Sequence, residues 1–366
     1  MSAVKESPAA LAETLIGEAE LLERALVLDM GRTTLAIRSN SAALLERLGD
    51  YFAHCLAPQA AATLEVIAIE REAPALDTAF VDWAREPGKT GRKDSYHDLP
   101  GGRLVRKVRT GMVFLQSAAL CVAAGPCLAH DNQVVNFVIA QYMNHLQRAD
   151  WQVCHAAALV RGGRALAIAG FSGGGKSTAM LHALEHPATV FLTNDRLFLK
   201  REGGEVRAAG VPKQPRINPG TALHNPRLET LMPAARRDQL RALPADALWE
   251  LEEKHDVPVA ARYGPDRLTD EAALGGFVVL NWRRDDASPP RVAAVDLTQR
   301  RDLLAAIMKS AGPFYQRADG SFLADDEPLD EAAYLDVLAG VPVFEVSGGI
   351  DFDALVAGHL IPLLEG

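Results

Sequence analysis

The chain has 366 residues, of which 48% are hydrophobic and 23% charged, and its formal net charge is −9. This length allows two domains, the composition is that of an ordinary globular protein, and the acidic balance disfavours a nucleic-acid partner. The four cysteines show neither metal-ligand spacing nor a dense disulfide framework, and the longest apolar stretch is too short to span a bilayer. The N-terminal segment predicts an amphipathic helix rather than a signal peptide, so we expect a cytoplasmic protein without membrane contact.

The N-terminal part of the chain, residues 1–128, predicts a small α/β domain. Apolar residues recur at helical spacing over residues 8–23 and 41–57. Runs rich in β-branched residues predict strands, two within 25–39, one over 63–71, one over 102–117 and one over 120–125. No chemical motif lies in this domain. We therefore expect it to serve packing, homo-oligomerisation or partner binding.

A second domain is expected over residues 129–366. Its first elements are a long amphipathic helix, two strands joined by a Gly-Gly turn, a helix and a strand, over residues 132–150, 151–170, 176–187 and 189–195. A glycine-rich loop separates the second strand from the second helix. This order predicts that the loop and the end of the last strand lie at the carboxyl edge of one sheet. The C-terminal residues predict a helix, a strand and a helix without a catalytic motif.

The glycine-rich loop, "GFSGGGKS", fits the Walker A pattern in full and has the required strand before it and helix after it. Its glycines let consecutive backbone N–H groups point at phosphate oxygens, and the following helix N-terminus favours the same anion. The residues expected to hold the phosphates of ATP are Gly170, Ser172, Gly173, Gly174, Gly175, Lys176, Ser177 and Thr178. The Ser177 hydroxyl is also expected to bind Mg²⁺.

Other motifs decide which class of phosphate-loop protein this is. The sequence lacks the Asn-Lys-x-Asp of a GTPase and the Leu-Ser-Gly-Gly-Gln signature of a transporter ATPase. Asp195 ends the strand after the loop helix, where small-molecule kinases often place a carboxylate. There it can bind Mg²⁺ or take the proton of an attacking hydroxyl.

The segments "HAAALV", "GFSGGGKS" and "LTND" together resemble the catalytic core of HPr kinase/phosphorylase, which is related to the nucleotide site of phosphoenolpyruvate carboxykinase. The match covers residues 130–220 and is nearest to the HPr-kinase-related kinase B group, associated with an ATP-grasp enzyme and an amphipathic peptide. The resemblance implies an α/β fold, with a P-loop kinase core behind an additional N-terminal α/β domain. It also implies catalytic roles for His155, Lys176 and Asp195.

The sequence departs from that family at two carboxylates. Asn194 stands where the family has the aspartate implied to be the general base, and an amide cannot accept the proton in the same way. Gln214 and Arg216 occupy the Glu and Arg positions of the family's Glu-x-Arg-Gly segment. Metal binding then depends more on Asp195, and the reverse phosphorolysis is in doubt. We expect Asn194, Lys213 and Arg216 to contact the substrate, since an Arg fork suits a carboxylate.

These observations predict an ATP- and Mg²⁺-dependent kinase that phosphorylates a hydroxyl of a small anionic hydroxy acid, glycerate- or serine-like. A serine kinase acting on a small protein or peptide is the nearest alternative. A non-catalytic nucleotide-gated module stays open, because Asn194 and Gln214 both replace carboxylates.

Overall fold

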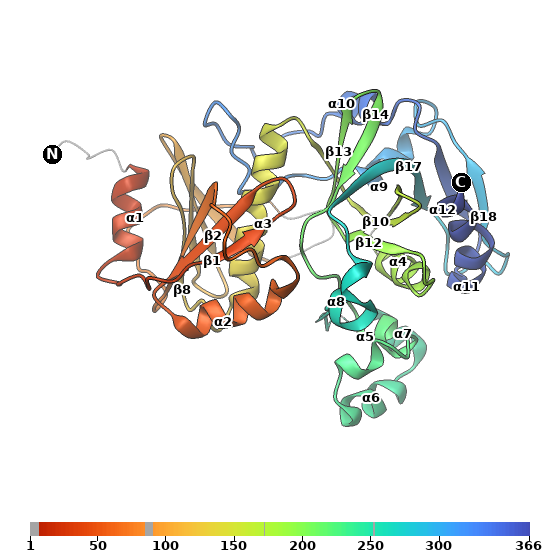
Figure 1. Ribbon diagram of the computed structural model, residues 1–366, viewed down its shortest axis with the longest axis horizontal. Helices are drawn as coiled ribbons and strands as arrows, with labels where there is room; N and C mark the ends of the chain where they lie inside the picture. The colour runs from red at the N-terminus through yellow and green to blue at the C-terminus, as the bar shows by residue number, and fades with distance from the viewer. Residues whose placement is uncertain (1–6, 85–90, 172, 252) are drawn as a thin grey trace. The chain divides into compact units, whose positions relative to one another are not determined.

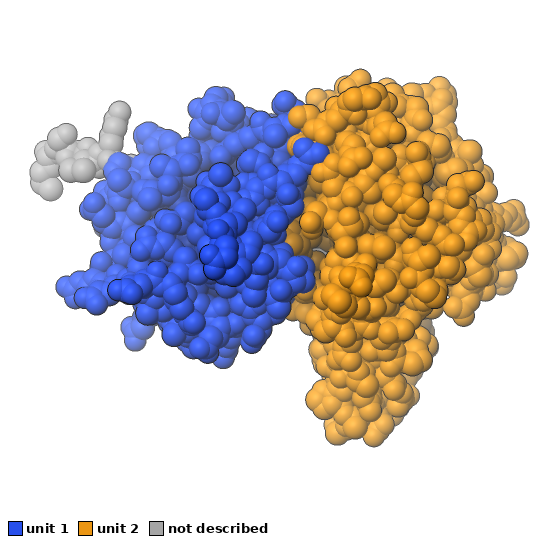
Figure 2. Space-filling view, viewed as in Figure 1, with its two compact units in different colours: residues 1–150, 310–328 blue, residues 151–309, 329–366 orange. Residues whose placement is uncertain are grey.

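The computed structural model describes residues 7–84, 91–171, 173–251 and 253–366 of a mixed α/β protein with several sheets. The chain forms two compact units, Met1–Asp150 with Ser310–Pro328, and Trp151–Lys309 with Leu329–Gly366 (Figure 2). Among the described residues, no helix combines the length and apolar character needed to cross a membrane.

The first unit is built on an eight-stranded sheet in the order β1-β2-β3-β8-β7-β6-β5-β4 (Figure 1). Strand β3 is parallel to both of its neighbours, and the remaining pairs are antiparallel. The strands are β1 (Leu26–Asp29), β2 (Thr34–Ser39), β3 (Leu64–Glu70), β4 (Val81–Asp82), β5 (Asp94–Leu99), β6 (Gly102–Lys107), β7 (Val113–Ser117) and β8 (Cys121–Gly125). The helices are α1 (Pro8–Ile16), α2 (Ala42–Tyr51), the 3₁₀ turn η1 (Ala53–Cys55) and α3 (Asp131–Arg148).

Helix α3 packs in the first unit, although we expected it to open the second domain. The Phe137 ring lies 5.0 Å from that of Phe114 in β7, and the Gln141 amide donates to Gln116 in the same strand at 2.7 Å. Phe314, from the segment that returns to this unit, lies 5.1 Å from Phe137. The observed units therefore divide after Asp150 rather than after the expected residue 128, because the apolar stripe of α3 is buried against the first sheet.

Two further features of this unit differ from the sequence prediction. Helix α1 ends at Ile16 rather than residue 23, because Gly17 takes a left-handed φ of 59° and its N–H closes the helix on Glu13. Strands β4 and β5 were not predicted, since their polar sequence lacks an apolar run. The side chains of Ser95 and Asp94 are nevertheless buried in β5.

The second unit is built on a nine-stranded sheet in the order β12-β10-β11-β17-β14-β13-β9, with β19 beside β17 and β18 beside β19. The strands are β9 (Gln152–Cys154), β10 (Ala156–Arg161), β11 (Arg164–Gly170), β12 (Val190–Thr193), β13 (Leu197–Glu202), β14 (Glu205–Ala209), β17 (Glu271–Leu280), β18 (Arg291–Ala294) and β19 (Val343–Ser347), with a separate ribbon of β15 (Arg216–Ile217) and β16 (His255–Asp256). The helices are α4 (Lys176–Leu184), α5 (Pro219–Leu223), η2 (Glu229–Leu231), α6 (Ala234–Arg241), α7 (Ala245–Glu250), α8 (Val259–Tyr263), η3 (Pro265–Arg267), η4 (Arg301–Leu303), α9 (Leu304–Ile307), α10 (Glu331–Leu338), α11 (Phe352–Leu355), the π-helix η5 (Val356–Leu360) and α12 (Ile361–Glu365).

Helices cover both faces of the second sheet. Alternate residues of β10 and β11 face opposite ways, so that Leu159 and Ile168 pack with α4 while Ala158 and Ala167 pack with α9 and α10. Both strands are therefore apolar on each face, as the runs "HAAALV" and "RALAIAG" require. Helix α4 packs against β10 and β11, and in Figure 1 the group α5 to α8 extends beyond it.

The direction of β10 positions the functional residues. β10 pairs antiparallel with β11 on one side and with β12 on the other, so β11 and β12 run in the same direction. The start of β10 and the ends of β11 and β12 therefore lie at one edge of the sheet. The glycine-rich loop and the end of β12 share this edge, as the order of elements predicted.

Arg103 in β6 joins the returning segment 310–328 to the first unit. Its side chain is 2% exposed, and it donates to the Asp98 carboxylate at 2.9 Å and to the Leu323 carbonyl at 2.9 Å. The guanidinium also lies 4.6 Å from the Tyr96 ring centroid and 4.7 Å from that of Phe322. The buried Arg103 guanidinium thus donates hydrogen bonds to acceptors in β5 and in the distant segment 310–328.

Arg103→Ala is expected to lower the free energy of unfolding by about 2–4 kcal/mol, because it removes charge-assisted hydrogen bonds and cation–π contacts and leaves the Leu323 carbonyl without this donor. Urea denaturation measures this loss. The matched control is Arg24→Ala, since Arg24 is 59% exposed and pairs loosely with Glu46 at 3.8 Å. Its expected effect is within about 0.5 kcal/mol, and equal losses for the two variants would contradict the anchoring role of Arg103.

Candidate functional site

The glycine-rich loop connects β11 directly to α4. Gly170 is the last residue of β11, Gly173 and Gly175 have left-handed φ angles of 76° and 84°, and α4 begins at Lys176. A Cβ on Gly175 would also lie 2.6 Å from the Phe352 ring, so both the backbone angle and the close contact exclude a side chain there. Ser172, an expected phosphate ligand, lies outside the described residues.

Two aromatic residues hold the outer side of the loop. The Trp282 indole N–H, just beyond β17, donates to the Gly174 carbonyl at 2.9 Å. The Phe352 ring stands edge-on to Trp282 with centroids 5.0 Å apart. Sequence reasoning missed both contacts, because these residues lie far from the loop along the chain and carry no motif. The loop conformation is therefore fixed by tertiary packing as well as by its own glycines.

The polar side chains that begin α4 are turned toward nearby protein groups. The Lys176 ammonium donates to the Gly170 carbonyl at 3.1 Å, across the loop. The Ser177 hydroxyl donates to the Asn194 amide oxygen at 3.0 Å, and the hydroxyls of Thr178 and Thr221 are 2.8 Å apart. The loop and the end of β12 are thus in direct contact through Ser177 and Asn194.

Asp195 is the central charged group at this edge. His155 Nε2 lies 3.1 Å from Asp195 Oδ1, and Arg196 Nε lies 3.7 Å from Oδ2. Asp195 has a φ of 72°, in the left-handed region that few residues other than glycine adopt. This strained turn follows β12 directly and lets Asn194 meet Ser177 while Asp195 meets His155. Strain of this kind is concentrated at functional sites.

The charge states of this pair differ from those of isolated side chains. Burial alone would raise the pKa of Asp195, but Arg196, His155 and Lys309 hold that pKa well below the usual range. Burial lowers the pKa of His155, and the contact with Asp195 opposes this only in part. Asp195 is therefore ionised and His155 neutral at neutral pH. Because the Asp195 side chain is 44% exposed, solvent screens these interactions.

Two lysines near Asp195 are also perturbed. Burial lowers the pKa of Lys176 to about 8 and that of Lys213 to about 8, while Asp195 opposes the shift in each. Arg196 and Arg216 contribute to lowering the pKa of Lys213. Lys213 therefore belongs to the same electrostatic environment as Asp195. Anions that bind beside either lysine will favour its charged form.

Arg216 and Gln214 have structural partners in the structure. Arg216 pairs with Asp256 across the β15–β16 ribbon, with Nε 3.3 Å from Oδ1. The Gln214 side-chain oxygen accepts the Val259 N–H at the start of α8 at 3.1 Å. Gln214 thus holds the start of α8 in place. Its position in the segment that resembles Glu-x-Arg-Gly did not predict this structural role.

The structure also adds two cations that sequence reasoning missed. Arg196 immediately follows Asp195, and its position in "LTNDR" was the available signal. Lys309 lies two residues beyond α9, far along the chain, and acts on the charges of both His155 and Asp195. His155, Lys176, Ser177, Asn194 and Asp195 are brought together as the sequence suggested, and these two cations enlarge the group.

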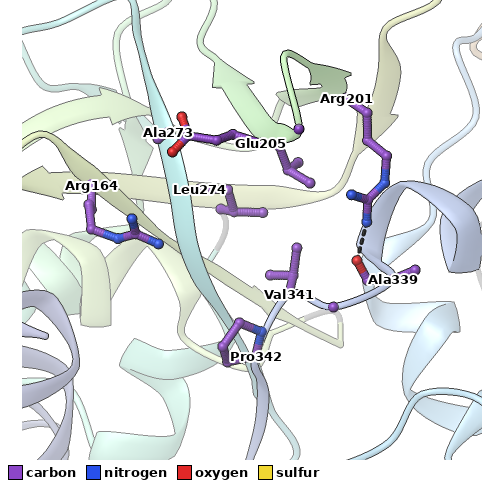
Figure 3. Close-up of a pocket in the computed structure, with 11 residues that line it drawn as sticks. Arg164, Arg201, Glu205, Ala273, Leu274, Ala339, Val341 and Pro342 are labelled. Atoms are coloured by element: carbon purple, nitrogen blue, oxygen red, sulfur yellow. Dashed lines mark hydrogen bonds between the residues drawn. The ribbon is translucent and has the colours of Figure 1, made fainter.

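A pocket of about 190 Å³ lies elsewhere in the second unit (Figure 3). Its lining includes Arg164 and Leu274, and Arg201 donates to the Ala339 carbonyl beside it. Arg164 begins β11, whereas Gly170 ends that strand, so the pocket is at the opposite edge from the loop. No group of three or more His, Cys, Asp or Glu side chains suited to a metal occurs among the described residues.

No family model matches this sequence, and no curated protein matches it. Among solved structures, the chain is similar to the Hpr(Ser) kinase/phosphatase from Coxiella burnetii, with 13% sequence identity and a TM-score of 0.29. The similarity covers 58% of this chain and 92% of that chain. At this TM-score the two backbones differ too much for residue roles to be transferred.

If the loop binds ATP, as the sequence predicts, the pKa of Lys176 predicts proton uptake on binding at pH 8.5. With a pKa of about 8, Lys176 is mostly neutral there in the free protein, and a polyphosphate beside it will restore the charge. We expect uptake of about three quarters of a proton at pH 8.5 and much less at pH 7. Calorimetric titration in buffers of different ionisation enthalpy measures this number.

Lys176→Arg is the control, because arginine keeps its charge throughout this pH range and takes up no proton. Equal uptake by the two proteins at pH 8.5 would show that another group accounts for the signal.

Proposed function

We propose that this protein is an ATP- and Mg²⁺-dependent kinase that transfers the γ-phosphate to a hydroxyl of a small hydroxy acid, glycerate- or serine-like. The observation that carries the proposal is the meeting of three chain segments at one sheet edge. His155, the loop with Lys176 and Ser177, and the pair Asn194–Asp195 are joined there by contacts of 3.0 and 3.1 Å. A polyphosphate on the loop would then lie beside an ionised carboxylate, as phosphoryl transfer requires.

The residues beside the loop fit a magnesium ion. Ser177 offers a hydroxyl, Asn194 an amide oxygen 3.0 Å from it, and Asp195 a carboxylate, all hard oxygen ligands. Ser177 and Asp195 would hold the ion, and Asn194 would orient the serine. When bound, Mg²⁺ offsets the negative charge of the phosphates.

The protein's own groups account for binding and orientation. The backbone N–H groups of the loop and of the α4 N-terminus, with Thr178 contributing through its backbone, would hold the phosphates. Lys176 would exchange its contact with the Gly170 carbonyl for a phosphate oxygen. His155, neutral, donates from Nε2 to Asp195 and holds that carboxylate in place.

The proposed reaction needs little general-base catalysis from this site. An Asp195 with so low a pKa is a weak base, so it orients the acceptor hydroxyl more than it deprotonates it. In a loose transition state the hydroxyl attacks while it still holds most of its proton, which then passes to solvent. This accounts for the tolerance of Asn194 in place of a second carboxylate. Lys213 and Arg216 would bind the anionic end of the acceptor.

One set of contacts favours a second candidate, a nucleotide-gated module without turnover. Lys176 already binds the Gly170 carbonyl and Ser177 already binds Asn194. ATP would break both contacts and could thereby release the end of β12. This candidate differs from the kinase in one measurable respect, the absence of a phosphorylated product.

Phosphorus NMR of protein, Mg²⁺ and ATP with glycerate, serine, other hydroxy acids and candidate peptides tests the proposal. We expect a new phosphomonoester with a small hydroxy acid. Lys176→Ala should abolish both the ester and the ATP-induced rise in melting temperature. An ester on a peptide alone would identify a protein kinase, and ATP binding without any ester would support the gated module.

Asp195→Asn is expected to lower kcat by at least about 100-fold, because it removes the ionised carboxylate from the reacting centre. The fold should survive, since the side chain is 44% exposed. Asp353→Asn is the matched control, because Asp353 is 94% exposed and lies 3.4 Å from His182 on the far end of α4. Similar rates for both variants would remove Asp195 from the mechanism.

Asn194→Asp tests whether the amide has a task of its own. A carboxylate there accepts the hydrogen bond from the Ser177 hydroxyl equally well, but it adds a negative charge beside Asp195. We expect weaker ATP binding without Mg²⁺ and a stronger dependence on Mg²⁺ concentration. A Mg²⁺ dependence identical to that of the wild type would show that residue 194 lies outside the metal environment.

A further inference from the structure

Arg196 carries a buried hydrogen-bond donor without a partner. Its Nη1 atom is inaccessible to solvent and makes no hydrogen bond with the described residues, while Nε lies 3.7 Å from the Asp195 carboxylate. Buried donors are rarely left unsatisfied, and each such group calls for an explanation. A charged guanidinium whose buried N–H has no acceptor is costly in free energy. The donor is therefore suited to a ligand atom.

Arg216 shows the same feature on the neighbouring ribbon. Its Nε atom is buried without a hydrogen bond, because the Asp256 carboxylate at 3.3 Å is not aligned to accept one. Both guanidinium groups act on the charge of Lys213, so the two arginines lie near the same lysine. The Val211 N–H donates to Thr193 Oγ1 at 3.4 Å, so the segment that leads to Arg216 starts beside the end of β12, where Arg196 also lies. Two buried, unsatisfied N–H donors thus belong to neighbouring segments.

We propose that Arg196 and Arg216 bind the carboxylate of the acceptor, and that the acceptor is a 2- or 3-hydroxy acid. This inference rests on the proposed kinase function and narrows its substrate class. Guanidinium groups present their N–H donors in a plane that matches the two oxygens of a carboxylate. A peptide serine has amide groups at the corresponding distance and offers no such charge.

The spacing between hydroxyl and carboxylate follows from the position of Arg196. Its Nε is 3.7 Å from Asp195 Oδ2, and Nη1 is about 2.3 Å from Nε within the planar guanidinium. A hydroxyl on Asp195 and a carboxylate on Nη1 are then separated by about 3–6 Å, with hydrogen bonds of ordinary length. One or two carbons between the groups span this distance. A longer acid must fold back to place both of its ends and loses more conformational entropy when it binds.

The reaction on such an acceptor balances as a simple transfer. The hydroxyl oxygen forms a bond to the γ-phosphorus, and the bond from that phosphorus to the β,γ-bridging oxygen breaks. ADP leaves with the bonding electron pair, and the hydroxyl proton passes to solvent. Arg196 and Arg216 keep the carboxylate fixed throughout.

The test compares acceptors of increasing length with the full-length protein, ATP and Mg²⁺. We expect kcat/KM for glycerate and 3-hydroxypropionate to exceed that for 6-hydroxyhexanoate and for glycerol by at least about 100-fold. Arg196→Gln should raise KM for the short acids at least about 10-fold and leave KM for ATP within about 2-fold. Arg196→Lys keeps the charge but loses the forked guanidinium. Its KM for the short acids should lie between those of the wild type and Arg196→Gln.

Arg164→Gln is the matched control, since Arg164 is an exposed arginine of the same sheet at the opposite edge. It should behave as the wild type with every acceptor. Equal rates across the length series, an unchanged KM in Arg196→Gln, or a preference for glycerol 3-phosphate over glycerate would overturn the inference while leaving the kinase in place.

A binding measurement separates this inference from the proposed function. With a non-hydrolysable ATP analogue present, glycerate should raise the melting temperature of the wild type and not that of Arg196→Gln. The analogue alone should stabilise both proteins equally, which also shows that the variant is folded. If no acceptor yields an ester, the kinase proposal fails, yet glycerate stabilisation still decides whether the carboxylate site exists. Equal stabilisation of both proteins by glycerate would contradict the site.

Discussion

Strand β10 runs antiparallel between β11 and β12, and the whole candidate site depends on this arrangement. Because of it, one strand begins where its two neighbours end, and three segments separated along the chain meet at one edge of the sheet. His155 precedes β10, the glycine-rich loop follows β11, and Asn194 and Asp195 follow β12. Were β10 parallel to its neighbours, His155 would lie at the opposite edge with Arg164.

Cationic side chains surround Asp195 at this edge, although the molecule as a whole carries a net negative charge. The chain carries a net charge of −9, yet Lys176, Arg196, Lys213 and Lys309 all act on the single carboxylate of Asp195. An anion would be attracted to this place on a protein whose net charge is negative. The lowered pKa values of the two lysines reflect first the cost of burying their ammonium groups, to which neighbouring cations add. An anion bound beside the two lysines would offset that cost.

Packing on the outer side keeps the loop in shape before any ligand arrives. Trp282 donates a hydrogen bond to the Gly174 carbonyl, and the Phe352 ring packs against Gly175. Ser177 donates a hydrogen bond to Asn194. The donors that would face a phosphate are therefore already ordered, and less conformational entropy is lost on binding. The left-handed conformation of Asp195 fits the same picture, because a strained turn persists only where surrounding contacts hold it.

The sequence by itself determined the α/β alternation, the hairpin at Gly162–Gly163, the loop with its helix, and the positions of Asn194 and Asp195. These features are encoded by residues close together in the chain, where period, turn chemistry and glycine content act locally. Only the tertiary structure decided that α3 packs in the first unit, that polar β5 joins a sheet, that Gln214 anchors α8, and that Trp282, Arg196 and Lys309 border the site. Each of these depends on contacts between distant segments, and such contacts are set by strand register and burial, which no short stretch of sequence carries.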